Sequence, residues 1–250
     1  MGFSSRCTLG WRLCVCLLLG ARRYLLTSMS DISSLRGLQA AVDGMAAGAA
    51  CAASASVMVV ADHASELSLA EQSLIASWAT HRQHEFATGR LCARRALAVL
   101  GLDGGNLLPD GDGVPQWPTG LVGSISHSRG VVIAVAARSA DCSLLGLDLE
   151  KTNRLRAAAI RKVVHPLEAD FVAGDQVKAS ILFSLKEAFY KAQFPRWRTT
   201  GNFHDLALGV DMEAGSAQVV EIDARFAPNL AQLRFGFRLV DDYVVSLCWG

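Results

Sequence analysis

The sequence predicts an α+β fold built from two comparable halves that meet near Gly146. Helical and strand-like segments alternate in both parts of the chain, which is the first observation behind this prediction. The second is composition, because 51% of the 250 residues are hydrophobic and only 19% are charged. That balance supplies enough apolar material for a large core and too little charge for a disordered chain.

Charge and cysteine content narrow the class of protein further. A formal net charge of +1 gives no reason to expect nucleic-acid binding, which needs a concentrated basic surface, so any phosphate recognition must be local. The seven cysteines are an odd number without a CxxC pair, and they fit neither a zinc site nor a disulfide framework. We therefore expect buried thiols in a cytoplasmic protein.

The N-terminal segment carries no recognisable chemistry. An apolar run over residues 13–19 lies between Arg12 and Arg22 and is too short to span a bilayer. We favour Met29 as the true start, which leaves membrane association unexpected, and a signal peptide or a membrane-surface anchor is the alternative. Because residues 30–56 are rich in Ala, Gly and Ser, we expect residues 1–56 to form an extension, disordered or partly upstream of the start.

Two helices are predicted in the first half. Ser68 and Glu71 have the spacing of a capping box, in which each side chain bonds the other residue's backbone N–H, so a helix should begin near Leu69. A second helix is expected at about 82–100, with apolar residues at helical spacing and Gly101 after its end.

Strand and helix patterns then alternate to the end of the chain. Pro195 should close the long C-terminal helix, because the residue before a proline disfavours helical geometry. The expected elements are strands at 121–126, 131–137 and 144–150, helices at 154–164 and 179–193, and strands at 232–240 and 243–249.

Two carboxylates lie on one predicted strand. Asp148 and Glu150 are two residues apart, so the strand period of two places both on the same face. Paired carboxylate oxygens suit Mg²⁺, a hard cation. A solvated strand end is the alternative interpretation of such a pair.

Further charged groups lie on the long C-terminal helix and in the first half. Glu187 and Lys191 share a helical face, since they are four residues apart, and apolar neighbours should partly enclose them together with Lys186. A surface ion pair is the alternative. Ser126 and His127 end a strand at a turn and could face a phosphate.

Taken in order, these segments resemble the 4′-phosphopantetheinyl transferase family, specifically its larger surfactin- and enterobactin-synthase type. The resemblance covers roughly residues 82–197. It implies a fold of two similar α/β halves packed about a pseudo-twofold, with coenzyme A phosphate contacts in residues 57–143 and the metal site and carrier docking in residues 144–250. The matching motifs are His84-Glu85-Phe86 through Arg94, Pro115-Gln116-Trp117-Pro118, Gly123-Ser124-Ile125-Ser126-His127, Gly146-Leu147-Asp148-Leu149-Glu150 and Phe183 through Ala192.

The resemblance also implies a role for each matching residue. Arg82, Arg90, Ser126 and His127 would contact the adenosine phosphates of coenzyme A. The sequence departs from the family pattern at Asp112, where many relatives have a basic residue. The remaining roles are Asp148, Glu150 and Glu187 as ligands of Mg²⁺, Lys186 and Lys191 as pyrophosphate contacts, and Glu187 and Lys191 as the catalytic pair.

The expected reaction is transfer of 4′-phosphopantetheine from coenzyme A to a serine of an apo peptidyl or acyl carrier protein. The enterobactin-type resemblance favours siderophore or other secondary-metabolite synthesis, and two halves in one chain favour a monomer. The alternatives are a metal-dependent phosphohydrolase and a silent module that binds coenzyme A or a carrier. A basic segment that could dock the acidic carrier comprises Lys151, Arg154, Arg156, Arg161 and Lys162.

Overall fold

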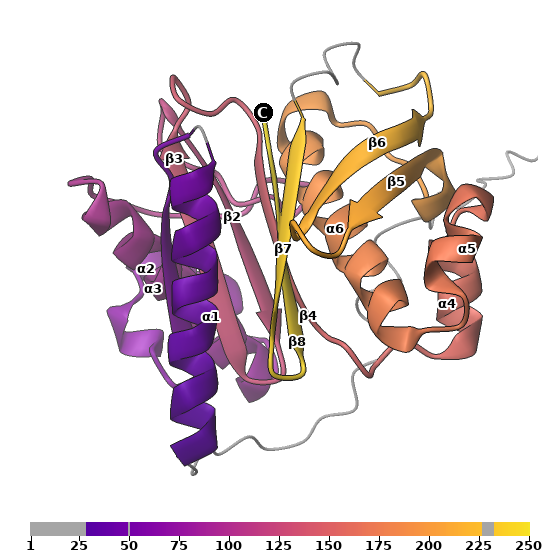
Figure 1. The fold of residues 1–250 in the computed structure, drawn as a ribbon. Coiled ribbons are helices and arrows are strands. Elements are labelled where there is room, and N and C mark those ends of the chain that lie inside the picture. The colour runs from indigo at the N-terminus through magenta and orange to yellow at the C-terminus, as the bar shows by residue number, and fades with distance from the viewer. Residues whose placement is uncertain (1–28, 50, 227–232) are drawn as a thin grey trace, which may run out of the picture.

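The computed structural model describes residues 29–49, 51–226 and 233–250 and confirms the α+β class. Within these residues the strands form two antiparallel sheets, one of three strands in the order β1-β3-β2 and one of five in the order β4-β8-β7-β6-β5. The two sheets therefore differ in size, although each carries a long helix on one face (Figure 1). The apolar run at 13–19 lies outside the described residues.

The first half contains the three-stranded sheet, with α3 packed on β1 and β3. The predicted capping box is present, because the Ser68 hydroxyl accepts from the Glu71 N–H and the Glu71 carboxylate accepts from the Ser68 N–H. The elements are α1 (Met29–Gly48), β1 (Ser54–Val59), η1 (Ala64–Glu66), α2 (Leu69–Ile75), α3 (Thr80–Val99), β2 (Leu121–Ser128) and β3 (Val131–Arg138).

The second half contains the five-stranded sheet, with α6 packed on β4 and β8. Strands β5 and β6 were not expected from the sequence. The elements are β4 (Leu145–Lys151), α4 (Ala157–Val163), η2 (Pro166–Glu168), α5 (Ala169–Val172), α6 (Gln176–Trp197), η3 (Phe203–Asp205), β5 (Leu206–Asp211), β6 (Ser216–Ile222), β7 (Arg234–Val240) and β8 (Tyr243–Trp249).

Helix α1 corrects the expectation of a disordered extension at 30–56. It packs against β1, β7 and β8, with Leu38 and Val42 fully buried (Figure 1). Its sequence is rich in alanine, which has the highest intrinsic helix propensity. Small residues also let it lie close to the sheet, since a Cβ atom at Gly37 would be 2.8 Å from the Val240 side chain.

Helix α6 is longer than expected and continues through Pro195 to Trp197. Its N-cap residue is Asp175, whose carboxylate accepts from the Val177 and Lys178 N–H groups. Pro195 lies in the last turn, where the missing N–H removes a single helical hydrogen bond and little helix remains to be disrupted. None of the helices in the described ranges is both long and apolar enough to cross a membrane.

The two sheets meet where β2 lies beside β4. Side chains rather than a strand ladder join them there. The Leu149 N–H donates to the Ser126 hydroxyl over 3.2 Å, and the Ser124 hydroxyl donates to the Leu147 carbonyl over 3.5 Å. This junction brings polar residues from both halves of the chain to one place.

Candidate active site

The strand β4 presents its acidic residues on one face, as predicted. Leu147 and Leu149 alternate with them and are buried in the core shared with α1 and β8. Asp148 is only 5% exposed, so its carboxylate is held inside the protein rather than at a solvated strand end. The alternative of a solvated strand end is therefore excluded for Asp148.

Gly146 allows helix α6 to lie directly on β4. A Cβ atom at this position would be 2.0 Å from the Ala188 carbonyl oxygen and 2.4 Å from the Ala192 nitrogen. No side chain fits in such a gap, so the glycine is required by the close approach. This contact sets the distance between the carboxylates of β4 and the residues of α6.

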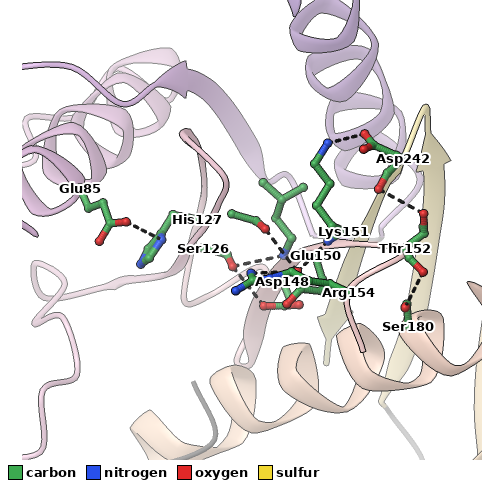
Figure 2. A network of polar contacts seen from close by, with 12 residues as sticks. Glu85, Ser126, His127, Asp148, Glu150, Lys151, Thr152, Arg154, Ser180 and Asp242 are labelled. Carbon is green, nitrogen blue, oxygen red and sulfur yellow. Dashed lines mark hydrogen bonds and ion pairs between the residues drawn. The ribbon is translucent and has the colours of Figure 1, made fainter. Parts of the chain in front are cut away.

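Asp148, Ser126 and Lys191 meet at the junction of β2, β4 and α6. The Lys191 ammonium donates to Asp148 Oδ1 over 2.6 Å and to the Ser126 hydroxyl over 2.9 Å. The Ser126 hydroxyl in turn donates to Asp148 Oδ1 over 3.0 Å. Figure 2 shows Ser126 and Asp148 side by side, with Glu150 and Arg154 next to them.

Glu187 is a buried carboxylate next to this group. Burial, together with the negative charge of Asp148, raises the pKa of Glu187 to about 8, although Lys191 acts in the opposite direction. Its Oε1 atom and the Oδ2 atom of Asp148 are buried without a hydrogen-bond partner. Two orphaned carboxylate oxygens in one place are costly in free energy unless a cation or proton joins them.

Glu150 lies at the outer end of the same strand face. Its Oε1 accepts from the Ser128 hydroxyl over 3.3 Å, from its neighbour's N–H, and from Arg154 over 3.4 Å. Burial and the charge of Asp148 raise the pKa of Glu150. Among the residues that the structure describes, no three His, Cys, Asp or Glu side chains are already arranged to hold a metal ion.

A cavity of about 530 Å³ opens between the two halves beside Lys191. Its walls come from α3, the loop at 109–117, β2 and the last turns of α6. Aromatic residues line much of it, and Trp117 also packs against Gly123, where a Cβ atom would be 2.4 Å from its ring. The predicted phosphate-binding residues that line the cavity are Arg82, Arg90, His127 and Lys191.

Glu85 connects two of these residues. Its carboxylate lies 3.1 Å from the Arg82 guanidinium and 3.7 Å from His127 Nδ1, as Figure 2 shows for the histidine. Burial lowers the pKa of His127. The charge of Glu85 raises this pKa, and the charge of Lys191 lowers it further. The Arg90 guanidinium lies 4.1 Å from the centre of the Phe86 ring and donates to the Leu107 carbonyl. These two contacts hold it at the cavity wall.

Comparison with known proteins identifies the family. Residues 70–137 match the model of the 4′-phosphopantetheinyl transferase N-terminal domain, and residues 144–248 match that of the 4′-phosphopantetheinyl transferase superfamily. The 4′-phosphopantetheinyl transferase Npt of Nocardia iowensis is 32% identical over 151 residues, which cover 59% of this chain and 68% of that protein. The chain belongs to the 4′-phosphopantetheinyl transferase family.

Two further phosphopantetheinyl transferases are similar over a smaller share of their length. Svp of Streptomyces mobaraensis is 41% identical over 141 residues, covering 54% of this chain and 57% of Svp. PptT of Mycobacterium tuberculosis is 36% identical over 139 residues, covering 54% of this chain and 61% of PptT. The chain thus spans less than two thirds of these two relatives.

Among solved structures, a holo-ACP-synthase from Plasmodium yoelii aligns with a TM-score of 0.32 and 17% identity. The alignment covers 43% of this chain and 93% of that one, and it adds nothing to the assignment.

The structure corrects the expected position of Lys186. Its side chain is 0% exposed, and its ammonium donates to Glu168 Oε2 over 2.7 Å and to the Val163 and Phe203 carbonyls over 2.9 Å. Neighbouring helical residues point about 100° apart, so Lys186 faces the core while Glu187 faces β4. Lys186 therefore does not reach the cavity.

Ser126 also has a different position from the one expected. The residue is 4% exposed, and its hydroxyl already has hydrogen bonds with Asp148, Lys191 and the Leu149 N–H. The cavity wall beside it is made by its neighbours on β2. Ser126 therefore contacts the Asp148 carboxylate rather than lining the cavity.

Two residues near the cavity were not singled out from the sequence as site residues. Glu85 was noted only as part of a motif, and its position between Arg82 and His127 emerges from the fold. Arg198 follows α6 and lies 2.6 Å from Asp110 Oδ2 and 3.3 Å from Asp112 Oδ2. It is 86 residues from Asp112 in sequence, so no local pattern reveals this contact.

Proposed function

We propose that this protein transfers the 4′-phosphopantetheine arm of coenzyme A to a serine hydroxyl of an apo carrier protein. One observation carries the proposal. The Lys191 side chain both lines the cavity and contacts Asp148, beside the buried carboxylate of Glu187. A positively charged hydrogen-bond donor, Lys191, and a proton acceptor, Glu187, thus lie together at the end of a cavity of suitable size for a nucleotide.

The reaction forms a bond between the serine oxygen and the β-phosphorus of coenzyme A and breaks the bond to the leaving 3′,5′-ADP. The serine loses a proton in this step, and Glu187 is the proposed acceptor. Lys191 would stabilise the negative charge on the departing phosphate. Arg82, Arg90 and His127 line the cavity and would bind the remaining phosphates.

The proposed cofactor is Mg²⁺, held by Asp148, Glu150 and Glu187. The unpartnered oxygens of Asp148 and Glu187 and the raised pKa values of Glu150 and Glu187 support this donor set. Bound Mg²⁺ would neutralise negative charge on the pyrophosphate. Because Glu150 is held by Ser128 and Arg154 in this structure, metal binding is expected to involve reorientation of its carboxylate.

The proposed carrier-docking surface is the exposed basic side of α4. Arg156, Arg161 and Lys162 are exposed there. Lys151 and Arg154 belonged to the expected set, but they pair with Asp242 and Glu150. Reversing the three exposed charges to glutamate should raise the carrier KM and leave the coenzyme A KM unchanged.

A matched control for this surface is Arg36→Glu on α1, which Figure 1 shows on the side of the molecule away from α4. It should leave both KM values unchanged. An equal rise of the carrier KM in the control, or of both KM values in the α4 variant, would count against docking at α4.

The biological setting is proposed from the enterobactin-type resemblance. We propose that the carrier belongs to siderophore or other secondary-metabolite synthesis and that the enzyme acts in the cytoplasm, where coenzyme A is available. A monomer is proposed because the cavity is formed by residues of both halves of one chain.

The proposed activity is tested by intact-protein mass spectrometry. An apo peptidyl or acyl carrier protein is incubated with the full-length chain, coenzyme A and Mg²⁺, with a chelator sample and an Asp148→Asn variant in parallel. The carrier should gain one phosphopantetheine group only with the unmodified chain and free Mg²⁺. Absence of the gain with several peptidyl and acyl carrier proteins, despite coenzyme A binding, would contradict a transferase and indicate a silent binding module.

A further inference from the structure

The loop at 109–117 is a preformed turn on the N-terminal side of the cavity. Pro109 and Pro115 pair as an isolated bridge, and the Asp110 carboxylate accepts from the N–H groups of Asp112 and Val114 over 2.9 Å. The Asp110 N–H donates to the Val114 carbonyl. The turn is therefore held by hydrogen bonds that converge on the Asp110 carboxylate.

Arg198 lies directly after α6, on the other side of the same cavity. It adopts the left-handed conformation with φ 55°, and its N–H donates to the Phe194 carbonyl to cap the helix. Its guanidinium lies 5.6 Å from the Phe194 ring centre, and Phe194 stacks on Tyr190. The Arg198 side chain thus extends from the aromatic residues at the end of α6 toward the loop at 109–117.

The ion pairs of Arg198 connect the two walls. Its guanidinium contacts Asp110 at 2.6 Å and Asp112 at 3.3 Å, and the Asp110 side chain is only 20% exposed. Burial opposes ionisation of Asp110, but the Val114 N–H and Arg198 outweigh it and lower the pKa of Asp110. The residues that form the two walls are Asp112, Val114 and Pro115 on the loop and Tyr190, Phe194 and Pro195 on α6.

We propose that Arg198, Asp110 and Asp112 form a latch that holds the loop at 109–117 against the end of α6 and so fixes the width of the coenzyme A cavity. This Arg198 latch rests on the proposed function for its effect on coenzyme A. Arg198 is a positioning residue, since it acts through the loop. It also neutralises two carboxylates that would otherwise repel an anionic ligand from the cavity rim.

A double-mutant cycle that measures the coenzyme A KM tests the latch. Arg198→Ala should raise the coenzyme A KM about fivefold, as expected for loss of a surface ion-pair network, and should leave kcat within about twofold. Arg196→Ala is the matched control, because Arg196 lies on the same helix end but its guanidinium donates to the Ser143 carbonyl over 3.5 Å. The control should leave the KM unchanged.

The cycle is completed with Asp112→Asn alone and combined with Arg198→Ala. If Arg198 acts through the loop carboxylates, the double variant should have a KM equal to or below that of Arg198→Ala, because the effects are not additive. If Arg198 instead contacts coenzyme A directly, the two effects should multiply, and this result would overturn the latch.

Hydrogen exchange in the ligand-free protein tests the latch independently of any transfer activity. Arg198→Ala should increase the exchange rate of the Asp112, Val114 and Gln116 amides at least fivefold. This factor corresponds to the same loss of loop stabilisation as the fivefold rise in the coenzyme A KM. Arg196→Ala should leave those rates unchanged. Unchanged exchange in Arg198→Ala would refute the latch even if the protein proves to be a transferase, and faster exchange without transferase activity would refute only the proposed function.

Discussion

The Lys186 ammonium donates to Glu168 Oε2 over 2.7 Å, and neither side chain is exposed to solvent. Glu168 Oε1 also accepts from the Leu208 N–H over 2.8 Å, so this carboxylate joins α6 to β5. Charges removed from water in this way are tolerated because each has several partners. The pair therefore supports the helix that carries Glu187.

Replacement of Lys186 by methionine should destabilise the fold rather than weaken coenzyme A binding. Loss of Lys186 leaves the buried Glu168 carboxylate without a counter-ion, which costs about 3–5 kcal/mol of unfolding free energy. Urea unfolding measures this loss, and the double variant Lys186→Met/Glu168→Gln should recover part of it. An unchanged unfolding free energy with a raised coenzyme A KM would instead place Lys186 at the pyrophosphate.

Gly146→Ala should separate α6 from β4. The added Cβ atom would lie 2.0 Å from the Ala188 carbonyl oxygen, and overpacking of this kind costs about 1–3 kcal/mol. Displacement of Glu187 and Lys191 relative to Asp148 should lower kcat about 100-fold. Thermal unfolding and carrier modification rates measure the two effects.

Gly44→Ala on α1 is the matched control for this change. A Cβ atom at Gly44 has nothing within 4 Å, and alanine is favoured over glycine inside a helix by roughly 0.5–1 kcal/mol. The control should therefore be slightly more stable and fully active. Full activity of Gly146→Ala would show that the close approach does not position the site.

Glu187→Gln should abolish most of the turnover while preserving the fold. The amide cannot accept the serine proton, so kcat should fall roughly 100- to 10,000-fold with Mg²⁺ saturating. Stability should be equal or higher, because the substitution removes a buried carboxylate whose charged form is disfavoured. Glu213→Gln at an exposed turn is the control, and near-normal turnover of Glu187→Gln would exclude Glu187 as the base.

Glu71 should make stability depend on acid pH. Burial raises its pKa, but hydrogen bonds from Arg94 and from the Ser68 and Leu107 N–H groups outweigh burial, so the pKa of Glu71 lies below its usual 4.5. The stabilisation is fully present above the unfolded pKa and is lost as the pH falls through the lower, folded value.

Thermal unfolding between pH 7 and about pH 3 measures this dependence. The Glu71→Gln variant should be less stable at pH 7 and should lose less stability on acidification than the unmodified chain. Parallel curves for the two proteins would contradict the ionised state of Glu71.

Local patterns predicted the parts of the fold that carry strong periodicity. The helix α3, the strands β2 to β4 and the acidic face of β4 were expected from spacing alone. Helix α1 was missed because its alanines and glycines give no amphipathic pattern, although its buried face includes Leu38. The strands β5 and β6 were not recognised either.

The candidate site was also predicted only in part, because spacing along the chain indicates local contacts and not contacts between distant segments. The spacing of four correctly joined Glu187 and Lys191 on one face, whereas the direction of Lys186 depends on where Glu168 and β5 pack, which sequence spacing does not reveal. Contacts between distant segments, such as Arg198 with Asp110, are likewise invisible until the chain folds.

The most direct test of the central claim is the stoichiometry of the two products. Release of 3′,5′-ADP is measured alongside carrier mass while the amount of apo carrier is varied, with coenzyme A and Mg²⁺ in excess. We predict one 3′,5′-ADP for each modified carrier and none without carrier. Release of 3′,5′-ADP or phosphate in the absence of carrier would contradict a transferase and indicate a phosphohydrolase.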